Sequence, residues 1–178
     1  MNGLADIEDV ARQQSEQLAW FAVRVRSHFE NIAAKHLQDR GFEQFCPVYE
    51  QERQWSDRKK LSQFPLFPGY VFCRLDPDRR LPVLTVPGVV DILGFASQPC
   101  PVPEHEIEHI RRMAESGCVV RPWPFITVGQ KVLIERGPLK GVEGLLQEIK
   151  GKYRLIVSVT MLQRSVATEI DRAWIRPI

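Results

Sequence analysis

Long apolar runs are missing from this 178-residue sequence. No segment approaches the about 18 consecutive apolar residues that a membrane-spanning helix requires. The first 17 residues are polar and acidic and lack the apolar centre of a signal peptide, so we treat residues 1–17 as a loose tail. These absences predict a cytoplasmic protein without a membrane partner.

Cysteine is also scarce, and its spacing excludes the common cysteine motifs. The four thiols are Cys46, Cys73, Cys100 and Cys118, so no C-x-x-C pair begins a zinc or redox site. Without a secretory signal we expect reduced, mostly buried thiols, with two disulfides as the alternative. His28 and His36 lack partners at ligand spacing. We therefore predict no metal and no cofactor.

Signatures of catalysis are absent as well. The sequence contains no recognisable Ser/His/Asp or Cys/His set and no glycine loop of the kind that cradles phosphate. The acidic group Glu104, Glu106 and Glu108 lies where a predicted helix begins, and acids there complement the helix dipole. We expect a protein that is not an enzyme.

The composition is that of a folded globular protein, with 44% hydrophobic and 26% charged residues. Its charge is unevenly divided. Residues 126–178 hold nine Lys/Arg against five acids, whereas residues 1–125 hold 15 against 17. Within the acidic part, residues 53–60 form a local basic cluster that includes Arg58, Lys59 and Lys60.

Hydrophobic periodicity predicts a mixed N-terminal domain. We expect a strand over 20–26 and then a helix capped by Ser27, which buries Phe29, Ile32, Ala33 and Leu37 and stops at Gly41. A long hairpin over 42–75 follows, with Trp55 and the basic cluster exposed at its tip. A short helix over 79–84, a strand over 89–95 and a helix from Pro103 to Gly117 complete an α+β fold: an antiparallel sheet with flanking helices.

The segment Pro65-Leu-Phe-Pro-Gly69 should form a bend, because two prolines cannot donate hydrogen bonds in a central strand. After it, residues 70–75 alternate as a strand does. Tyr70, Phe72 and Arg74 should share one face of the sheet and Val71, Cys73 and Leu75 the other.

The pattern of the C-terminal part predicts only strands and turns. We expect strands over 131–135, 144–149, 153–160 and 165–170 and a last one near Trp174, the pattern of a small five-stranded barrel. The Pro-rich stretch before it is predicted to be a linker. The expected domains are therefore 18–117 and 126–178, joined by 118–125.

Four residues of the segment 128–144 carry the first recognisable motif: Gly137, Pro138, Gly141 and Gly144. Two tight turns and one position without room for a side chain explain the glycines, and the segment resembles a KOW motif. Upstream, Trp20-Phe-Ala-Val-Arg-Val25 and Pro65-Leu-Phe-Pro-Gly-Tyr-Val-Phe72 resemble the first strand and the turn-strand of the NusG N-terminal domain. From about residue 19 to 178 the chain is similar to the NusG family of transcription elongation factors, with a C-terminal SH3-like KOW barrel.

The resemblance implies a non-catalytic, monomeric factor that binds the clamp helices of the largest RNA polymerase subunit. The residues that match the family's polymerase-binding surface are Trp20, Phe67, Tyr70 and Phe72. Aromatic side chains suit this role because they bury large areas at low entropic cost. The alternative is that these rings pack beneath the two helices of their own domain.

The resemblance further implies contact with upstream or non-template DNA. The matching residues are Arg24, Arg26, Ser27, His28 and His36. Arg58, Lys59 and Lys60 at the hairpin tip would add electrostatic attraction to the duplex. A solvated charged face is the alternative for all of them.

One loop departs from the family pattern. Housekeeping NusG proteins carry Phe-Gly-Arg after the third barrel strand, whereas this chain has Met161-Leu-Gln-Arg164. The chain therefore looks like a specialised paralogue of the RfaH and UpxY-like group, and contact with the termination factor Rho is in doubt. Pairing of the ribosomal NusE protein with the barrel edge is less affected, because strand addition uses backbone groups.

The run 155–160 is β-branched and disfavours the helical hairpin that the RfaH barrel can adopt. The other function left open is an RNA-binding, ribosome-associated protein that uses its KOW barrel on rRNA.

Overall fold

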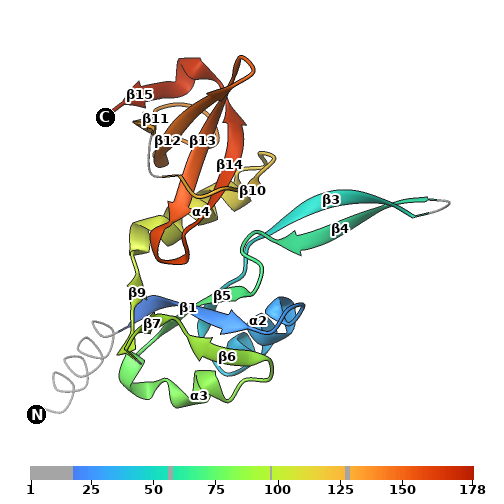
Figure 1. Cartoon of the computed structure of the whole chain (residues 1–178), viewed down its shortest axis with the longest axis vertical. Helices are drawn as coiled ribbons and strands as arrows, with labels where there is room; N and C mark the ends of the chain where they lie inside the picture. The colour runs from blue at the N-terminus through green and yellow to red at the C-terminus, as the bar shows by residue number, and fades with distance from the viewer. Residues whose placement is uncertain (1–17, 56–57, 97, 127–128) are drawn as a thin grey trace, which may run out of the picture. The chain divides into compact units, whose positions relative to one another are not determined.

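The computed structural model describes residues 18–55, 58–96, 98–126 and 129–178, whose elements are drawn in Figure 1. The side chains of residues 53–60 and the predicted tail 1–17 lie outside the described part. The chain forms two compact units: the first comprises the chain up to Cys46 together with Gly69–Val102, and the second comprises Pro47–Pro68 and Pro103–Ile178. Each unit is described by itself.

An antiparallel sheet is the centre of the first unit. Its strand order is β2-β5-β1-β6, and β9 also pairs with β1. The bounds are β1 (Ala19–Val25), β2 (Glu43–Phe45), β5 (Tyr70–Leu75), β6 (Val89–Ile92) and β9 (Pro101–Val102), with a separate small hairpin of β7 (Gly94–Phe95) and β8 (Gln98–Pro99). The predicted strands over 20–26 and 70–75 are confirmed, and the one over 89–95 is divided between β6 and β7.

Two α-helices and one 3-10 turn complete this unit: α2 (Glu30–Asp39), α3 (Leu81–Leu84) and η1 (Pro77–Arg79). Gly41 ends α2 at φ +82°, as predicted. The predicted start is wrong, because Phe29 and not Ser27 precedes the first helical residue. A turn with His28 at φ +67° precedes the helix, which therefore begins later than predicted. Its buried side includes Ala34, whereas Ile32 is 46% exposed.

The core of the first unit lies on one face of the sheet. Phe21, Val23 and Val25 of β1 pack with Val71, Cys73 and Leu75 of β5. Ala33, Ala34 and Leu37 of α2 and Val83 of α3 close this core from the helix side (Figure 1). The predicted division of β5 into two faces is therefore confirmed, with the even-numbered residues left on the face away from this core.

The four cysteines are free thiols, as predicted. Only Cys73 is buried, so the expectation of mostly buried thiols is wrong for exposed Cys100 and for half-buried Cys46 and Cys118. Burial raises the pKa of Cys73 to about 12 and that of Cys46 to about 11. Both thiols therefore stay protonated and unreactive at neutral pH.

The second unit is built mainly from a six-stranded antiparallel sheet in the order β10-β14-β13-β12-β11-β15. The strands are β10 (Arg121–Trp123), β11 (Gln130–Ile134), β12 (Glu143–Ile149), β13 (Lys152–Val159), β14 (Arg164–Ile170) and β15 (Ile175–Pro177), with two 3-10 turns, η2 (Thr160–Leu162) and η3 (Arg172–Trp174). All five predicted strands are present. β10 lies in the predicted linker, where Pro122 is tolerated because β10 is an edge strand.

The remaining elements of this unit are helix α4 (Glu104–Glu115) and the hairpin of β3 (Val48–Trp55) and β4 (Arg58–Pro65). The hairpin is confirmed, with Val48 opposite Pro65 and Trp55 opposite Arg58. Helix α4 packs against β13 (Figure 1). Its buried stripe contains the predicted Ile107, Ile110 and Met113, and also Glu106, whose carboxylate accepts hydrogen bonds from the backbone N–H and hydroxyl of Thr160.

The three glycines of the motif, Gly137, Gly141 and Gly144, have the predicted local geometry. Gly137 and Gly141 adopt φ +77° and +84°, the left-handed region that favours glycine. Gly144 lies in β12 so close to its neighbour that an added Cβ would stand 2.4 Å from the carbonyl oxygen of Ile156. Two turns and one crowded strand position therefore account for the three glycines.

Candidate functional site

The face of the first sheet that points away from the α2 core gathers aromatic side chains. Pairing places Trp20 opposite Arg74, Ala22 opposite Phe72, and Arg24 opposite Tyr70. Residues directly opposite each other lie on the same side of a sheet. Strand β2 extends this side with Phe45 opposite Phe72. We call Trp20, Phe45, Tyr70 and Phe72 the aromatic face.

Phe72 is the centre of the aromatic face. Its ring stacks on that of Phe45, with centroids 6.2 Å apart and planes inclined by 29°. The side chains of Phe72 and Trp20 are buried, at 0% and 1% exposure, whereas Tyr70 and Phe45 are half-buried. Tyr70 and Phe45 are therefore the rings of this face that solvent reaches.

This burial corrects the expectation of an exposed aromatic patch. Trp20, Phe72 and Phe67 are all buried, Phe67 at 1% exposure. Trp20 and Phe72 do not belong to the core beneath α2 and α3. A half-open aromatic surface with a buried centre remains, and Tyr70 is its accessible predicted member.

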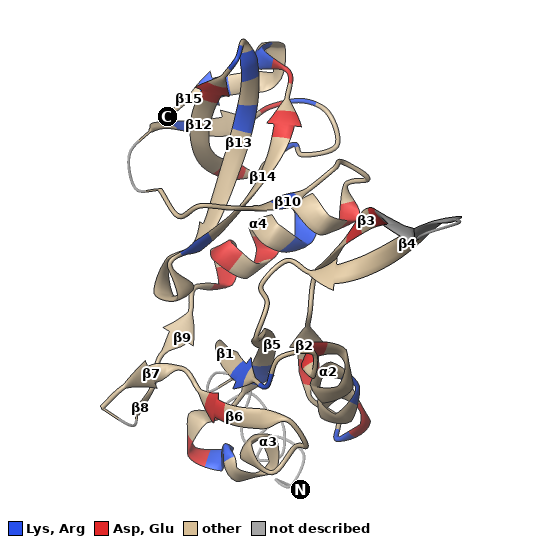
Figure 2. Ribbon diagram, turned by 45° about the vertical axis from the view of Figure 1, so that its right-hand side comes forward, with Lys and Arg blue, Asp and Glu red and all other residues tan. Residues whose placement is uncertain are grey.

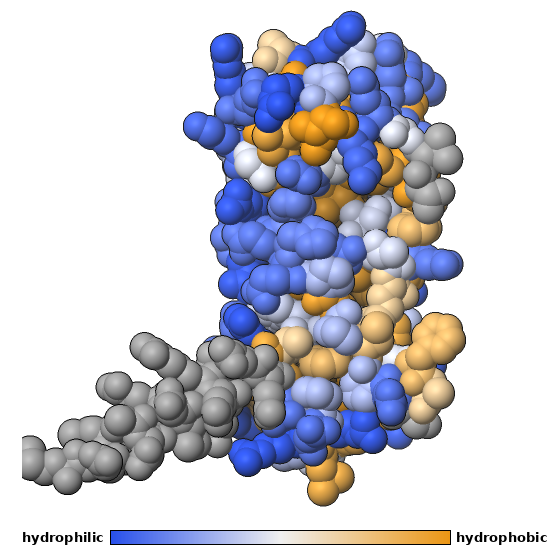
Figure 3. All heavy atoms as spheres, turned by 90° about the vertical axis from the view of Figure 1, so that its left-hand side faces the viewer, coloured by the Kyte–Doolittle hydropathy of each residue, from blue (hydrophilic) through white to orange (hydrophobic). Residues whose placement is uncertain are grey.

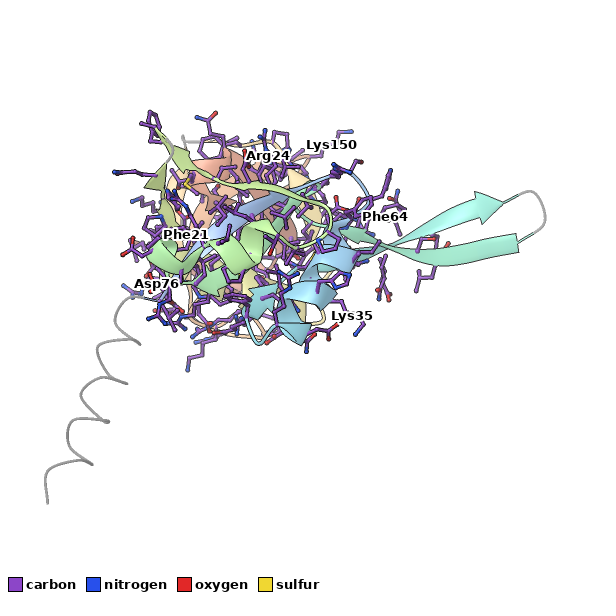
Figure 4. All side chains as sticks on the ribbon, turned by 90° about the horizontal axis from the view of Figure 1, so that it is seen from below. Phe21, Arg24, Lys35, Phe64, Asp76 and Lys150 are labelled. Carbon is purple, nitrogen blue, oxygen red and sulfur yellow. The ribbon has the colours of Figure 1, made fainter. Side chains whose placement is uncertain are left out.

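Two ion pairs flank the aromatic face. The Arg24 guanidinium binds Asp91 of β6 through Nε–Oδ1 at 3.0 Å and Nη2–Oδ2 at 2.5 Å, and both side chains are about half exposed. This hydrogen-bonded carboxylate raises the pKa of Arg24 further above its usual value. Arg74 lies 3.6 Å from Glu43 of β2. Figure 2 colours the basic and acidic positions along the ribbon, and Figure 4 labels Arg24 and Phe21 of β1, whose register places them on opposite faces.

The residues predicted to contact nucleic acid divide into three groups. Arg26, Ser27 and His28 are exposed together in the turn between β1 and α2, and His36 is exposed on α2. The turn is held at its start, because the Arg26 backbone N–H donates to the Gly88 carbonyl at 2.8 Å. Arg24 differs, since Asp91 neutralises it. The side chains of Arg58, Lys59 and Lys60 lie outside the described residues.

Basic residues of the second unit are in part paired with acids. The Lys152 Nζ lies 2.9 Å from Glu169 on the neighbouring strand, and this ammonium lowers the pKa of Glu169. The Arg154 guanidinium lies 3.6 Å from the same carboxylate and 4.8 Å from the centre of the Trp123 ring. Because Glu169 pairs with both of these basic residues, fewer of them can bind phosphate than the number of Lys and Arg in this unit suggests. Figure 2 also colours the basic and acidic positions of this unit.

Large apolar side chains are also exposed elsewhere in the described residues. The most exposed are Phe95 at 89%, Leu81 at 69% and Val119 at 68%. On the side of the molecule drawn in Figure 3, hydrophobic residues occur in separate patches among hydrophilic ones. Isolated exposed apolar residues are normal in soluble proteins and do not by themselves mark a binding site.

Neither a metal-binding cluster nor a membrane-spanning helix is found in the described part of the chain. No group of three or more His, Cys, Asp or Glu side chains there could hold a metal ion. Within the same residues, no helix is long and apolar enough to cross a membrane.

Some site residues were missed from the sequence. Phe45 lies in a three-residue strand too short for a periodicity signal, and shares its face with Glu43. Asp91 is recognisable only when β6 pairs with β1. Glu30, predicted merely as part of a helix cap, is buried and bonded to Gly69. Long-range pairing, absent from local patterns, brings these residues to the site.

Comparisons of the sequence and the structure with known proteins agree on one family. A family model described as transcription termination factor NusG matches residues 18–111. Transcription termination/antitermination proteins NusG from Escherichia coli K12 and Buchnera aphidicola are 28% and 27% identical, over 85% and 89% of this chain and 92% and 95% of their own lengths. A solved structure of Thermotoga maritima NusG is similar with a TM-score of 0.51 and 25% identity, covering 92% of this chain and 99% of that one.

Proposed function

Because this chain belongs to the NusG family of transcription termination/antitermination factors, we propose that it binds RNA polymerase through the aromatic face and modulates pausing or termination. The observation that carries the proposal is the position of this face, on the side of the sheet away from the α2 core. Tyr70 and Phe45 are the rings of this face that a partner can reach, whereas Phe72 and Trp20 are buried.

The proposed partner element is the pair of clamp helices of the largest polymerase subunit. Tyr70 supplies the accessible ring; Phe72 follows it on the same face of β5, Trp20 lies opposite Arg74 at the other end of β5, and Phe67 precedes β5 in the sequence. A half-buried tyrosine is preorganised, so little rotamer entropy is lost when a helix docks on it. The Arg24–Asp91 and Arg74–Glu43 pairs offer polar contacts around an apolar centre, the usual anatomy of an interface.

Nucleic acid is the second proposed partner of the first unit. Arg26, Ser27, His28 and His36 are exposed, and the first three share one turn. An exposed arginine and a histidine can neutralise phosphate or contact a base of upstream or non-template DNA. Arg58, Lys59 and Lys60 belong to the hairpin of the second unit and would add attraction to the duplex from there. In contrast, the carboxylate that already binds Arg24 makes it the weakest candidate.

We expect Arg26→Ala to reduce the salt dependence of DNA association. Loss of one phosphate contact should lower the slope of log affinity against log salt by about 1. Arg24→Ala is the matched control, because Asp91 neutralises Arg24 and its loss should leave the slope nearly unchanged. The slope is measured by titrating a transcription elongation complex at several salt concentrations. Equal slopes for Arg26→Ala and the wild type would remove Arg26 from the interface.

The second unit is proposed to be a KOW domain that recruits another partner, the ribosome through its NusE protein or Rho. Its loop after β13 consists of η2 and Gln163 at φ +48°, and Arg164 donates to the carbonyl of Pro68 at 2.7 Å. The loop lacks the aromatic and glycine residues of housekeeping NusG proteins, which favours a specialised paralogue and disfavours Rho. We propose a monomeric, non-catalytic factor that acts in the cytoplasm.

Binding of the full chain to core RNA polymerase tests the proposal directly. We expect a stable complex on size exclusion and a changed pause lifetime in single-round transcription. An absence of complex formation with polymerase, together with sedimentation of the chain with ribosomes, would instead establish the rRNA-binding alternative. An absence of both interactions would contradict the proposed function altogether.

A further inference from the structure

A buried carboxylate links the two turns that carry the proposed binding residues. Glu30 is the first residue of α2 and is only 6% exposed. Its Oε1 accepts a hydrogen bond of 2.8 Å from the backbone N–H of Gly69, 39 residues further along the chain. Gly69 immediately precedes Tyr70, the accessible ring of the aromatic face.

Gly69 is held from a second direction as well. Its carbonyl accepts a hydrogen bond of 2.9 Å from the backbone N–H of Val25, the last residue of β1. Both polar backbone groups of Gly69 are thus bonded, one to the end of β1 and the other to the start of α2. At φ +85°, Gly69 has a conformation that strand pairing alone does not impose, so these two bonds define the entry into β5.

The turn between β1 and α2 is fixed in a similar way. The Arg26 N–H donates to the carbonyl of Gly88 at 2.8 Å, and the Phe29 N–H donates to that of Arg26 at 3.0 Å. An added Cβ on Gly88 would stand 2.5 Å from the Phe29 ring, so the ring packs directly on this backbone. Glu30 follows at once and projects from a rigid turn toward Gly69.

We propose that Glu30 is a positioning residue, which sets the backbone of Gly69 and thereby the placement of Tyr70 relative to the exposed turn of Arg26 and His28. This inference rests on the proposed function, because the placement matters only if these two elements bind the same partner complex. It assigns to Glu30 a role distinct from binding, since its buried side chain does not face a partner.

The chemistry of the contact makes a specific demand on residue 30. An oxygen acceptor is required, because the N–H of half-buried Gly69 would otherwise lose its partner within the chain. The side chain must also have the length of glutamate to reach across from α2. Glutamine retains both features and loses only the charge, whereas aspartate keeps the charge and is one methylene too short.

Polymerase binding by Glu30→Gln and Glu30→Asp therefore tests the proposal. We expect Glu30→Gln to bind core polymerase within about threefold of the wild type and Glu30→Asp to bind about tenfold more weakly, since the unpaired amide lets the turn relax. In a Tyr70→Ala background, Glu30→Asp should cause little further loss. The opposite ranking of the two variants, or fully additive effects of Glu30→Asp and Tyr70→Ala, would overturn the positioning role.

A second readout does not depend on polymerase. Amide hydrogen exchange of Gly69 in the free chain should accelerate at least tenfold in Glu30→Asp and change little in Glu30→Gln. Asp39→Ala, an exposed acid at the other end of α2, is the matched control and should leave the exchange unaltered. Unchanged exchange in Glu30→Asp refutes the inference, whereas accelerated exchange in a chain that does not bind polymerase refutes only the proposed function.

Discussion

Replacement of Tyr70 with alanine is expected to weaken binding to RNA polymerase by about 30-fold or more, the effect of removing a central aromatic residue from an interface. Tyr70 is half-buried beside Phe72 in β5 and opposite Arg24 in β1. It is therefore held in place before a partner arrives and still presents part of its ring. Surface biosensor titration of immobilised core polymerase measures the change directly.

Tyr70 is a cleaner probe than Phe72. Phe72 is fully buried and stacked on Phe45, so Phe72→Ala would cost about 3–5 kcal/mol of folding stability and confuse lost binding with lost structure. Tyr153 supplies a matched control. It is also a half-buried tyrosine beside an arginine, with Arg172 5.3 Å from its ring centre, but it lies in the second unit. Equal losses of polymerase affinity in Tyr70→Ala and Tyr153→Ala would show that the aromatic face is not the polymerase-binding surface.

Alternation in the sequence was sufficient to predict the two faces of β5. The side chains of Val71, Cys73 and Leu75 enter the helix-covered core, and Tyr70 and Phe72 point the other way. Alternation reports on which side a residue lies and carries no information about what covers that side. For this reason the aromatic residues were placed on the correct face, while the sequence left open whether Trp20 and Phe72 are exposed or buried.

The wrong helix start has a similar origin. Ser27 has the chemistry of a cap, and Glu30 stands three residues later, as in a capping box. In the structure the chain first makes a turn through His28 at positive φ, and Glu30 is drawn to Gly69 instead of to the helix backbone. A partner distant in sequence overrode the local signal. The same holds for β10, where pairing with β14 gives strand structure to a stretch whose prolines indicate a linker.

Substitution of Gly144 with alanine is expected to have the largest effect on folding, about 3 kcal/mol of lost stability in the second unit. The new Cβ would stand 2.4 Å from the Ile156 carbonyl oxygen and 2.9 Å from Cδ1 of Leu155. Gly144 also pairs with Val132 of β11, so β12 cannot move away from β13 without disturbing its other neighbour. Differential scanning calorimetry should show the melting transition lowered by roughly 10 °C.

Gly129→Ala is the control for this effect, because its Cβ would approach the Leu146 carbonyl oxygen only to 3.3 Å. A small shift of the neighbouring backbone relieves that contact, and we expect a loss below about 1 kcal/mol. The comparison separates crowding from the entropic gain of replacing glycine with alanine in the unfolded chain, which would make both substitutions stabilising. If Gly144→Ala melts no lower than Gly129→Ala, β12 and β13 are not held at the spacing that Gly144 permits. Crowding by Ile156 would then no longer explain why residue 144 is glycine.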